Sequence, residues 1–249
     1  ELDTRWGPLS ALDGRVFAVK RDGVAAMGTF AKAQNTQNGV TNDMTEDALS
    51  APWDWAASVA GAALYYGSID PARPFQTLEL KGIMGAPEGK RRIAAENELL
   101  LSNGVSTHTI GNDGKVYIER LVTTYSENAT GAEDTAYKSL NTVMIMSYYR
   151  KSIINRFKLK YPRHKLATNG HPAAGFASNI ITPETGMAEF IAHYKLMGEA
   201  GIMDDFDGYK ADIISNKNSQ KRGRLDVFDQ PRPIDQFHQL AVRSAFRLI

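Results

Sequence analysis

The sequence contains no cysteine. This absence excludes disulfide bridges and thiolate metal sites, although it decides nothing about the compartment. An excess of either charge is also lacking, because 29 lysines and arginines balance 28 aspartates and glutamates for a net charge of +1. Bulk electrostatics therefore predicts no strong polyanionic partner. No uncharged apolar run approaches the roughly 20 residues of a membrane helix, so we expect no membrane insertion.

Motifs for catalysis or cofactor binding are missing as well. The chain has no G-x-S-x-G, no phosphate-binding glycine loop and no H-E-x-x-H. Its histidines form no ligand spacing, and we expect His193 to be a surface or boundary residue of a helix. The segment "MDDFDG" fails as a calcium loop, because Met203 and Ile214 stand where ligands are needed. We therefore predict no catalytic residue, no metal site, no cofactor and no enzyme activity.

The start of the chain, "ELDTRWGPLS", has neither the basic nor the apolar region of a signal peptide. It begins with Glu1 and resembles the interior of a longer chain, so we expect a fragment. With 249 residues, 43% of them hydrophobic, the chain is long enough for one large domain or two modest ones.

Short strand patterns alternate with helix patterns along the chain. The turn signal "GNDG" predicts a hairpin, and Gly104, Thr182-Pro183 and Gly201 mark helix ends. This order predicts an α/β to α+β fold with a mixed sheet and flanking helices. The expected strands are 14–23, 77–83, 105–125 as the hairpin, 209–215, 224–228 and the C-terminal strand. The expected helices are 24–35, 50–66, 90–104, 138–162 and 182–201.

Residues 35–52, "NTQNGVTNDMTEDALSAP", are rich in Asn and Thr and are expected to form a polar loop. Ser50 is the expected N-cap of the next helix, with Pro52 in its first turn. That helix contains many alanines and glycines, which favours close packing inside the protein.

A cluster of cations follows in "RKSIINRFKLKYPRHK", which also has an apolar helix face. Three interpretations stay open: a solvated helix face, a charge patch between subunits, and a nucleic-acid surface. The cations are Arg150, Lys151, Arg156, Lys158, Lys160, Arg163 and Lys165.

The chain finishes with "HQLAVRSAFRLI", in which apolar residues alternate with others. One face carries Leu240, Val242, Phe246 and Leu248, while the other carries the arginines at 243 and 247. This alternation predicts a strand with one apolar face. It pairs either within its own sheet or with a neighbouring subunit.

The order of several segments resembles the tail sheath protein of Mu-like contractile-tailed phages. The segments are residues 70–83, 91–125, 135–167, 179–210 and 222–233, so the resemblance covers nearly the whole chain. It implies the C-terminal half of a sheath subunit. The implied domains are the end of a subtilisin-like domain (1–45), the sheath C-terminal α/β domain (46–233) and a C-terminal strand arm (234–249).

The resemblance implies a structural role without catalysis. Subunits would polymerise as stacked six-fold rings around a tail tube, and contraction would drive the tube through the host envelope, without direct nucleic-acid binding. The implied partners are other sheath subunits, the tube protein, the baseplate and the tail terminator. The implied location is the virion tail, assembled in the host bacterial cytoplasm.

The resemblance also implies which residues mediate assembly. The C-terminal arm would add a strand to a neighbour's sheet, with Pro231 and Pro233 setting its departure. Leu240, Val242, Phe246 and Leu248 would fill the apolar side, and Arg243 and Arg247 would face outward. From their charge alone, the candidates for contacts remade on contraction are Arg150, Lys151, Arg156, Lys158, Lys160, Asp204, Asp205 and Asp207. The alternatives are a small-molecule enzyme of mixed α/β fold and a nucleic-acid module that uses the basic helix.

Overall fold

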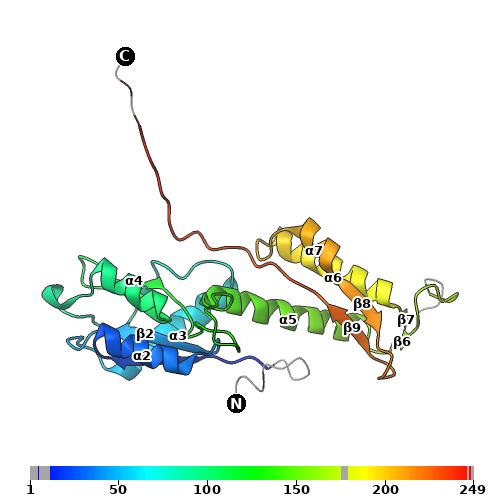
Figure 1. Cartoon of the computed structure of the whole chain (residues 1–249), viewed down its shortest axis with the longest axis horizontal. Helices are drawn as coiled ribbons and strands as arrows, with labels where there is room; N and C mark the ends of the chain where they lie inside the picture. The colour runs from blue at the N-terminus through cyan, green and yellow to red at the C-terminus, as the bar shows by residue number, and fades with distance from the viewer. Residues whose placement is uncertain (1–4, 6–11, 175–178, 246, 248–249) are drawn as a thin grey trace. The chain divides into compact units, whose positions relative to one another are not determined.

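The computed structural model describes residues 5, 12–174, 179–245 and 247, and it divides the chain into two compact units (Figure 1). The sheet unit comprises Arg15–Asn141 and Asp235–Ile249. The helical unit comprises Glu1–Gly14 and Thr142–Ile234. Each unit has its own secondary structure and its own packing.

The sheet unit is built on a five-stranded mixed sheet in the order β1-β2-β4-β5-β3. The first three strands in this order run parallel, and β5 and β3 are antiparallel to their neighbours. The predicted mixed sheet and the "GNDG" hairpin are confirmed. The strands are β1 (Val16–Arg21), β2 (Gly39–Met44), β3 (Glu79–Leu80), β4 (Val105–Ile110) and β5 (Val116–Arg120).

Helices cover both faces of this sheet. Val105 of β4 joins a fully buried cluster with Met27, Ala31 and Leu100. The next residue, Ser106, lines a small cavity beside Trp55. Successive strand residues point to opposite faces, so α2 and α4 lie on one face and α3 on the other. These helices are α2 (Val24–Gln34), α3 (Pro52–Ile69) and α4 (Ala94–Ser102), and the turn η1 (Glu88–Lys90) precedes α4.

Strand β2 shows that the loop predicted for residues 35–52 is wrong. This strand is buried between β1 and β4, although it carries Thr41, Asn42 and Asp43. Polar groups tolerate burial when they are hydrogen-bonded. Asn42 donates to the carbonyl of Ala18 at 3.0 Å, and Arg92 binds the Asp43 carboxylate at 3.3 Å. The predicted domain boundary after residue 45 comes directly after β2. This strand is hydrogen-bonded to β4 in the same sheet, so strands from the two sides of the boundary are neighbours.

The start of α3 also differs from the prediction. The N-cap is Ala51, and Pro52 is the first helical residue. Ser50 instead accepts a hydrogen bond from the Met84 amide at 2.7 Å, so its hydroxyl fixes a loop and does not cap the helix. The helix continues to Ile69, three residues beyond the predicted end at Tyr66.

The described residues of the helical unit form three helices and two small sheets. Helix α6 begins as predicted, because the Thr182 hydroxyl accepts from the Thr185 amide, and Gly201 follows it with a φ of +72°. The strand predicted over 209–215 is wrong in its first part, which belongs to a helix capped by Asp205. The elements are α5 (Leu140–Lys160), β6 (Lys165–Leu166), β7 (Ile180–Ile181), α6 (Pro183–Glu199), α7 (Phe206–Asp212), β8 (Ile214–Lys217) and β9 (Leu225–Phe228).

The predicted helix over 138–162 and the strand over 224–228 are confirmed as α5 and β9. Strands β8 and β9 form an antiparallel hairpin that packs on α6. Phe157 of α5 lies 5.3 Å from Phe190 of α6, measured between ring centroids. None of the helices in the described part of the chain is both long and apolar enough to cross a membrane.

Candidate assembly surfaces

The basic helix α5 directs two of its cations to one carboxylate. Arg156 and Lys160 both bind Glu189 of α6, and the Tyr161 hydroxyl donates to the same group at 3.1 Å. Glu189 is only 5% exposed. Burial alone would raise the pKa of Glu189, but these three donors outweigh it and hold the pKa below its usual value. Two of the seven cations are thus used to join α5 to α6.

The other cations of α5 differ in environment. Arg150 binds Asp13 at 2.5 Å within the helical unit. Lys151 and Lys158 are exposed, and neither makes an ion pair with a described residue. A shallow, open depression of about 700 Å³ lies between α5 and His193 of α6, with exposed Leu159 on its lining. This mixture indicates a surface for protein contact more than a continuous cationic track for a nucleic-acid backbone.

The predicted acidic residues lie in the loop before α7 and in its first turn. Asp205 caps α7 through the Gly208 amide at 3.1 Å and binds Arg232. Asp204 accepts from the Asp205 amide at 2.8 Å, and Asp207 is exposed. The structure thus links Asp205 to Arg232, which the sequence pattern did not single out.

A serine and a histidine meet between α5 and α6. His193 Nε2 lies 2.7 Å from the Ser152 hydroxyl, and the imidazole stacks on Tyr149. The expected surface or boundary position of His193 is wrong, because the residue is buried and only 5% exposed. Ser152 donates to the Tyr149 carbonyl, and His193 Nδ1 has no hydrogen-bond partner among the described residues. The pair therefore lacks the orienting acid of a hydrolytic triad.

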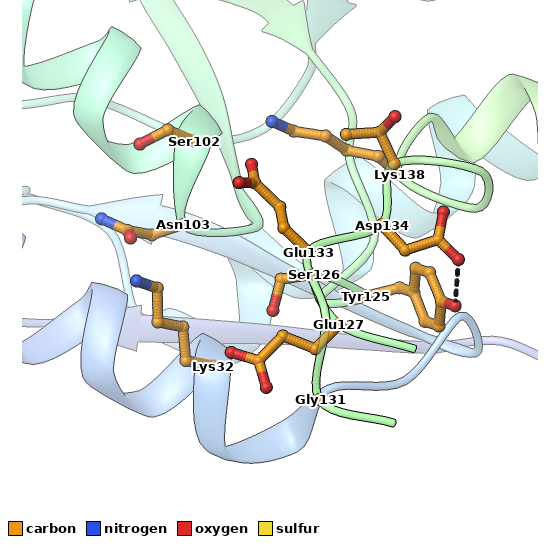
Figure 2. A pocket seen from close by; sticks show the side chains of 11 residues that line it. Lys32, Ser102, Asn103, Tyr125, Ser126, Glu127, Gly131, Glu133, Asp134 and Lys138 are labelled. Carbon is orange, nitrogen blue, oxygen red and sulfur yellow. Dashed lines mark hydrogen bonds between the residues drawn. The ribbon is translucent and has the colours of Figure 1, made fainter. Parts of the chain in front are cut away.

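A pocket of about 420 Å³ opens in the sheet unit between α2, the end of α4 and the loop 125–138 (Figure 2). Lys32 and Lys138 line it together with Glu127 and Glu133, and Tyr125 donates to Asp134 at 2.7 Å. Both signs of charge are therefore present at its walls. Among the described residues, no group of three or more histidines and acids could hold a metal ion.

The described part of the C-terminal arm is exposed from Gln239 onward, whereas Gln236 and His238 are half-buried and bond to Ser139 and Gln76 of the sheet unit. Leu240 and Val242 are 74% and 71% exposed, and Arg243 and Arg247 are exposed as well. No described residue from 229 to 245 belongs to a strand. Phe246 and Leu248, which were predicted for the apolar face, lie outside the described residues. The pairing of the arm thus stays a prediction.

Two further surfaces leave apolar side chains in solvent. In the β8–β9 hairpin, the cross-strand partners Ile214 and Phe228 are both exposed. Helix α3 carries a single charged residue, Asp54, and a larger exposed apolar set. Helices that are apolar on all sides are usually covered. The exposed apolar residues of α3 are Trp53, Leu64, Tyr65, Tyr66 and Ile69.

Comparison with known proteins identifies the class. The phage tail sheath protein central domain matches residues 1–124, and the phage tail sheath C-terminal domain matches residues 132–247. The chain belongs to the phage tail sheath family, which confirms the resemblance seen in the sequence. This is a family of structural phage tail proteins, not a class of enzymes.

A Mu-like prophage FluMu tail sheath protein from Haemophilus influenzae is 32% identical over 248 residues. That match spans all of this chain and 50% of the relative, so the chain spans half the relative's length. The sheath tail protein from Desulfitobacterium hafniense has a TM-score of 0.54 at 11% identity, over 93% of this chain and 51% of that one. A contracted PVC sheath of an extracellular contractile injection system has a TM-score of 0.57 at 10% identity, over 92% of this chain and 63% of that one. At these identities the two structures support the fold alone.

Proposed function

We propose that the chain is part of a structural subunit of a phage contractile tail sheath. Subunits polymerise as stacked six-fold rings around the tail tube, and contraction drives the tube through the host envelope. The observation that carries this proposal is the exposed apolar arm of a chain that belongs to the sheath family. An apolar segment of this kind is a liability in a free monomer and an advantage in a polymer.

In this proposal, the arm of one copy adds a strand to another copy. The β8–β9 hairpin is a suitable acceptor, because a sheet of only two strands has an edge on each side. Exposed Ile214 and Phe228 would pack against Leu240 and Val242, while backbone hydrogen bonds fix the register. A third strand also stabilises a hairpin that is marginal alone.

The apolar face of α3 supports the same proposal. Trp53 is 73% exposed, and other large apolar side chains follow it along the helix. Several large apolar side chains exposed on one helix favour a protein contact. Repeated in each copy, such a contact would build a ring where the rotation closes and an open helical array where it does not.

The remaining partners of the proposal are the tail tube, the baseplate and the tail terminator. The unpaired cations Lys151 and Lys158, together with exposed Asp207, are available for contacts that differ between the extended and contracted arrays. The proposed location is the virion tail, after assembly in the host bacterial cytoplasm.

Negative-stain electron microscopy tests the proposal on the complete gene product that carries these residues. We compare the wild type with a version that ends at Asp235. An Arg243→Gln variant is the control, since it keeps the apolar face of the arm. We expect long hollow tubes from the wild type and the control, and none from the truncation. Tubes from the truncation would place the arm outside the lattice contacts, and a wild type that stays monomeric at high concentration would refute the sheath function.

A further inference from the structure

Residues 229–234, which lead into the arm and include its first residue, are held by three sets of contacts within the helical unit. We propose that this segment, which we call the arm root, is a clamp that fixes where the chain leaves the helical unit to become the arm. Motion of a neighbouring copy that holds the arm is thereby transmitted to α5, α6 and α7. This inference rests on the proposed function, because it requires that the arm bind another copy.

Backbone contacts form the first part of the clamp. The Asp204 amide donates to the Arg232 carbonyl at 2.9 Å, and the Ile234 amide donates to the Ile202 carbonyl at 3.1 Å. Pro233 forms an antiparallel bridge with Met203 between these two bonds. The arm root therefore lies along the loop after α6 like a short added strand.

The Arg232 side chain forms the second part. It binds Asp205 and lies 2.7 Å from the Asp212 carboxylate, so one guanidinium spans both ends of α7. The planar fork of arginine suits two carboxylates better than the point charge of lysine. A Cβ at Gly208 would overlap both the Arg232 guanidinium and the Asp205 carboxylate. Glycine at this position leaves room for the ion pair.

Tyrosines form the third part. The Tyr194 hydroxyl accepts from the Arg232 amide at 3.0 Å and donates to the Asp204 carbonyl at 2.6 Å. Tyr149 donates to the Asp229 carboxylate at 2.7 Å, and its hydroxyl lies 2.9 Å from that of Tyr209. Tyr194 and Tyr209 stack with ring centroids 3.6 Å apart. Each of α5, α6 and α7 thus contributes one tyrosine to this network.

Beyond the arm root, Gln236 and His238 bond to Ser139 and Gln76 of the sheet unit, and the described chain is exposed from Gln239 onward. Ile234 is held by its amide, whereas Leu240 and Val242 face solvent. The Arg232 ion pairs are themselves partly exposed and contribute little to stability. Three helices hold this one short segment, although the contacts add little to the stability of the fold. We therefore infer that the network serves to position the segment.

Two measurements on the complete gene product test the clamp. Hydrogen exchange in the unassembled protein reports how often residues 229–234 open, and electron microscopy reports tube formation. The variants are Arg232→Gln, which removes the charge, and Gly208→Ala, which displaces the guanidinium and keeps all charges. Lys195→Gln is the matched control, because it removes another exposed ion pair, with Glu199 on α6.

We expect exchange across 229–234 to rise about five- to thirtyfold in Arg232→Gln and Gly208→Ala. Tubes should be fewer and shorter, although the unfolding midpoint shifts by no more than about 4 °C. Arg232→Lys should show smaller changes than Arg232→Gln in both exchange and tube formation, and Lys195→Gln should match the wild type. Unchanged exchange would refute the clamp, as would faster exchange with tubes of wild-type length and diameter. If the wild type forms no tubes, the proposed function fails and the clamp's role in transmitting motion fails with it.

Discussion

Replacing Glu189 by glutamine should weaken the junction between α5 and α6. The carboxylate is buried and receives Arg156, Lys160 and Tyr161. A hydrogen bond to a charged group contributes about 1.5–3 kcal/mol. The Lys160 side chain is 53% exposed, so its ion pair with Glu189 contributes at most about 1 kcal/mol to the free energy of unfolding. The Arg156 side chain is only 29% exposed, so its ion pair contributes more. Glutamine retains an acceptor, so we expect a loss of about 2 kcal/mol.

The assay is urea unfolding at pH 7, followed by far-ultraviolet circular dichroism. The control is Glu199→Gln on the same helix, whose carboxylate lies 4.0 Å from Lys195 in an exposed pair. This control should change the free energy of unfolding by less than about 0.5 kcal/mol. A loss in Glu189→Gln no larger than that of the control would refute the reasoning.

The pH dependence gives an independent check of the same carboxylate. Its pKa in the folded protein lies below the ordinary value of 4.5. The stabilisation is therefore complete above pH 4.5 and is lost as the pH falls through the lowered folded pKa. The difference between wild type and Glu189→Gln should shrink in that acidic range, and a constant difference would contradict an ionic origin.

Three further predictions concern the sheet unit. Burial, followed by the charge of Arg92, lowers the pKa of His108 from 6.5 to about 4. The free energy of unfolding should therefore fall by about 3 kcal/mol between pH 6.5 and 4, partly offset by Asp43, because burial raises the pKa of that carboxyl. In acid denaturation, a His108→Gln variant should show a smaller fall. Asn35→Ala should cost about 2 kcal/mol and speed hydrogen exchange of residues 126–127, because the Asn35 side chain accepts from both of those amides; unchanged exchange would contradict this. Trp53→Glu should leave the unfolding free energy within about 0.5 kcal/mol but reduce tube formation in electron microscopy, and normal tubes would exclude the α3 face from the lattice.

Local signals in the sequence predicted the elements that depend on local chemistry. The turn between β4 and β5 needs a residue with positive φ, and Gly114 supplies it at +77°. Helix α6 begins at a threonine cap followed by proline, and Gly201 follows its end. These features require contacts only a few residues apart, so a single sequence is sufficient to find them.

Strand β2 could not be found in this way. Its Asn42 and Asp43 favour turns when their neighbours are solvent. They form a buried strand here because Ala18 and Arg92, 24 and 49 residues away, supply their hydrogen-bond partners. The α7 segment was missed for a related reason, since its apolar residues suit a strand until the Asp205 cap is recognised.

The ion pairs of the helical unit were missed for the same reason, because their partners are distant in the sequence. The sequence showed that α5 is basic and that Asp205 is acidic, but a count of charges does not show which cation meets which carboxylate. Glu189 lies 33 residues from Arg156, and Arg232 lies 27 residues from Asp205. Arg232 stands between two prolines, so the pattern predicted a stiff link and gave no sign of an anchor. Once the fold places these groups together, the exposed cations and the clamped arm root become distinct surfaces, and substitutions at Lys151 and at Arg232 should affect assembly through different contacts.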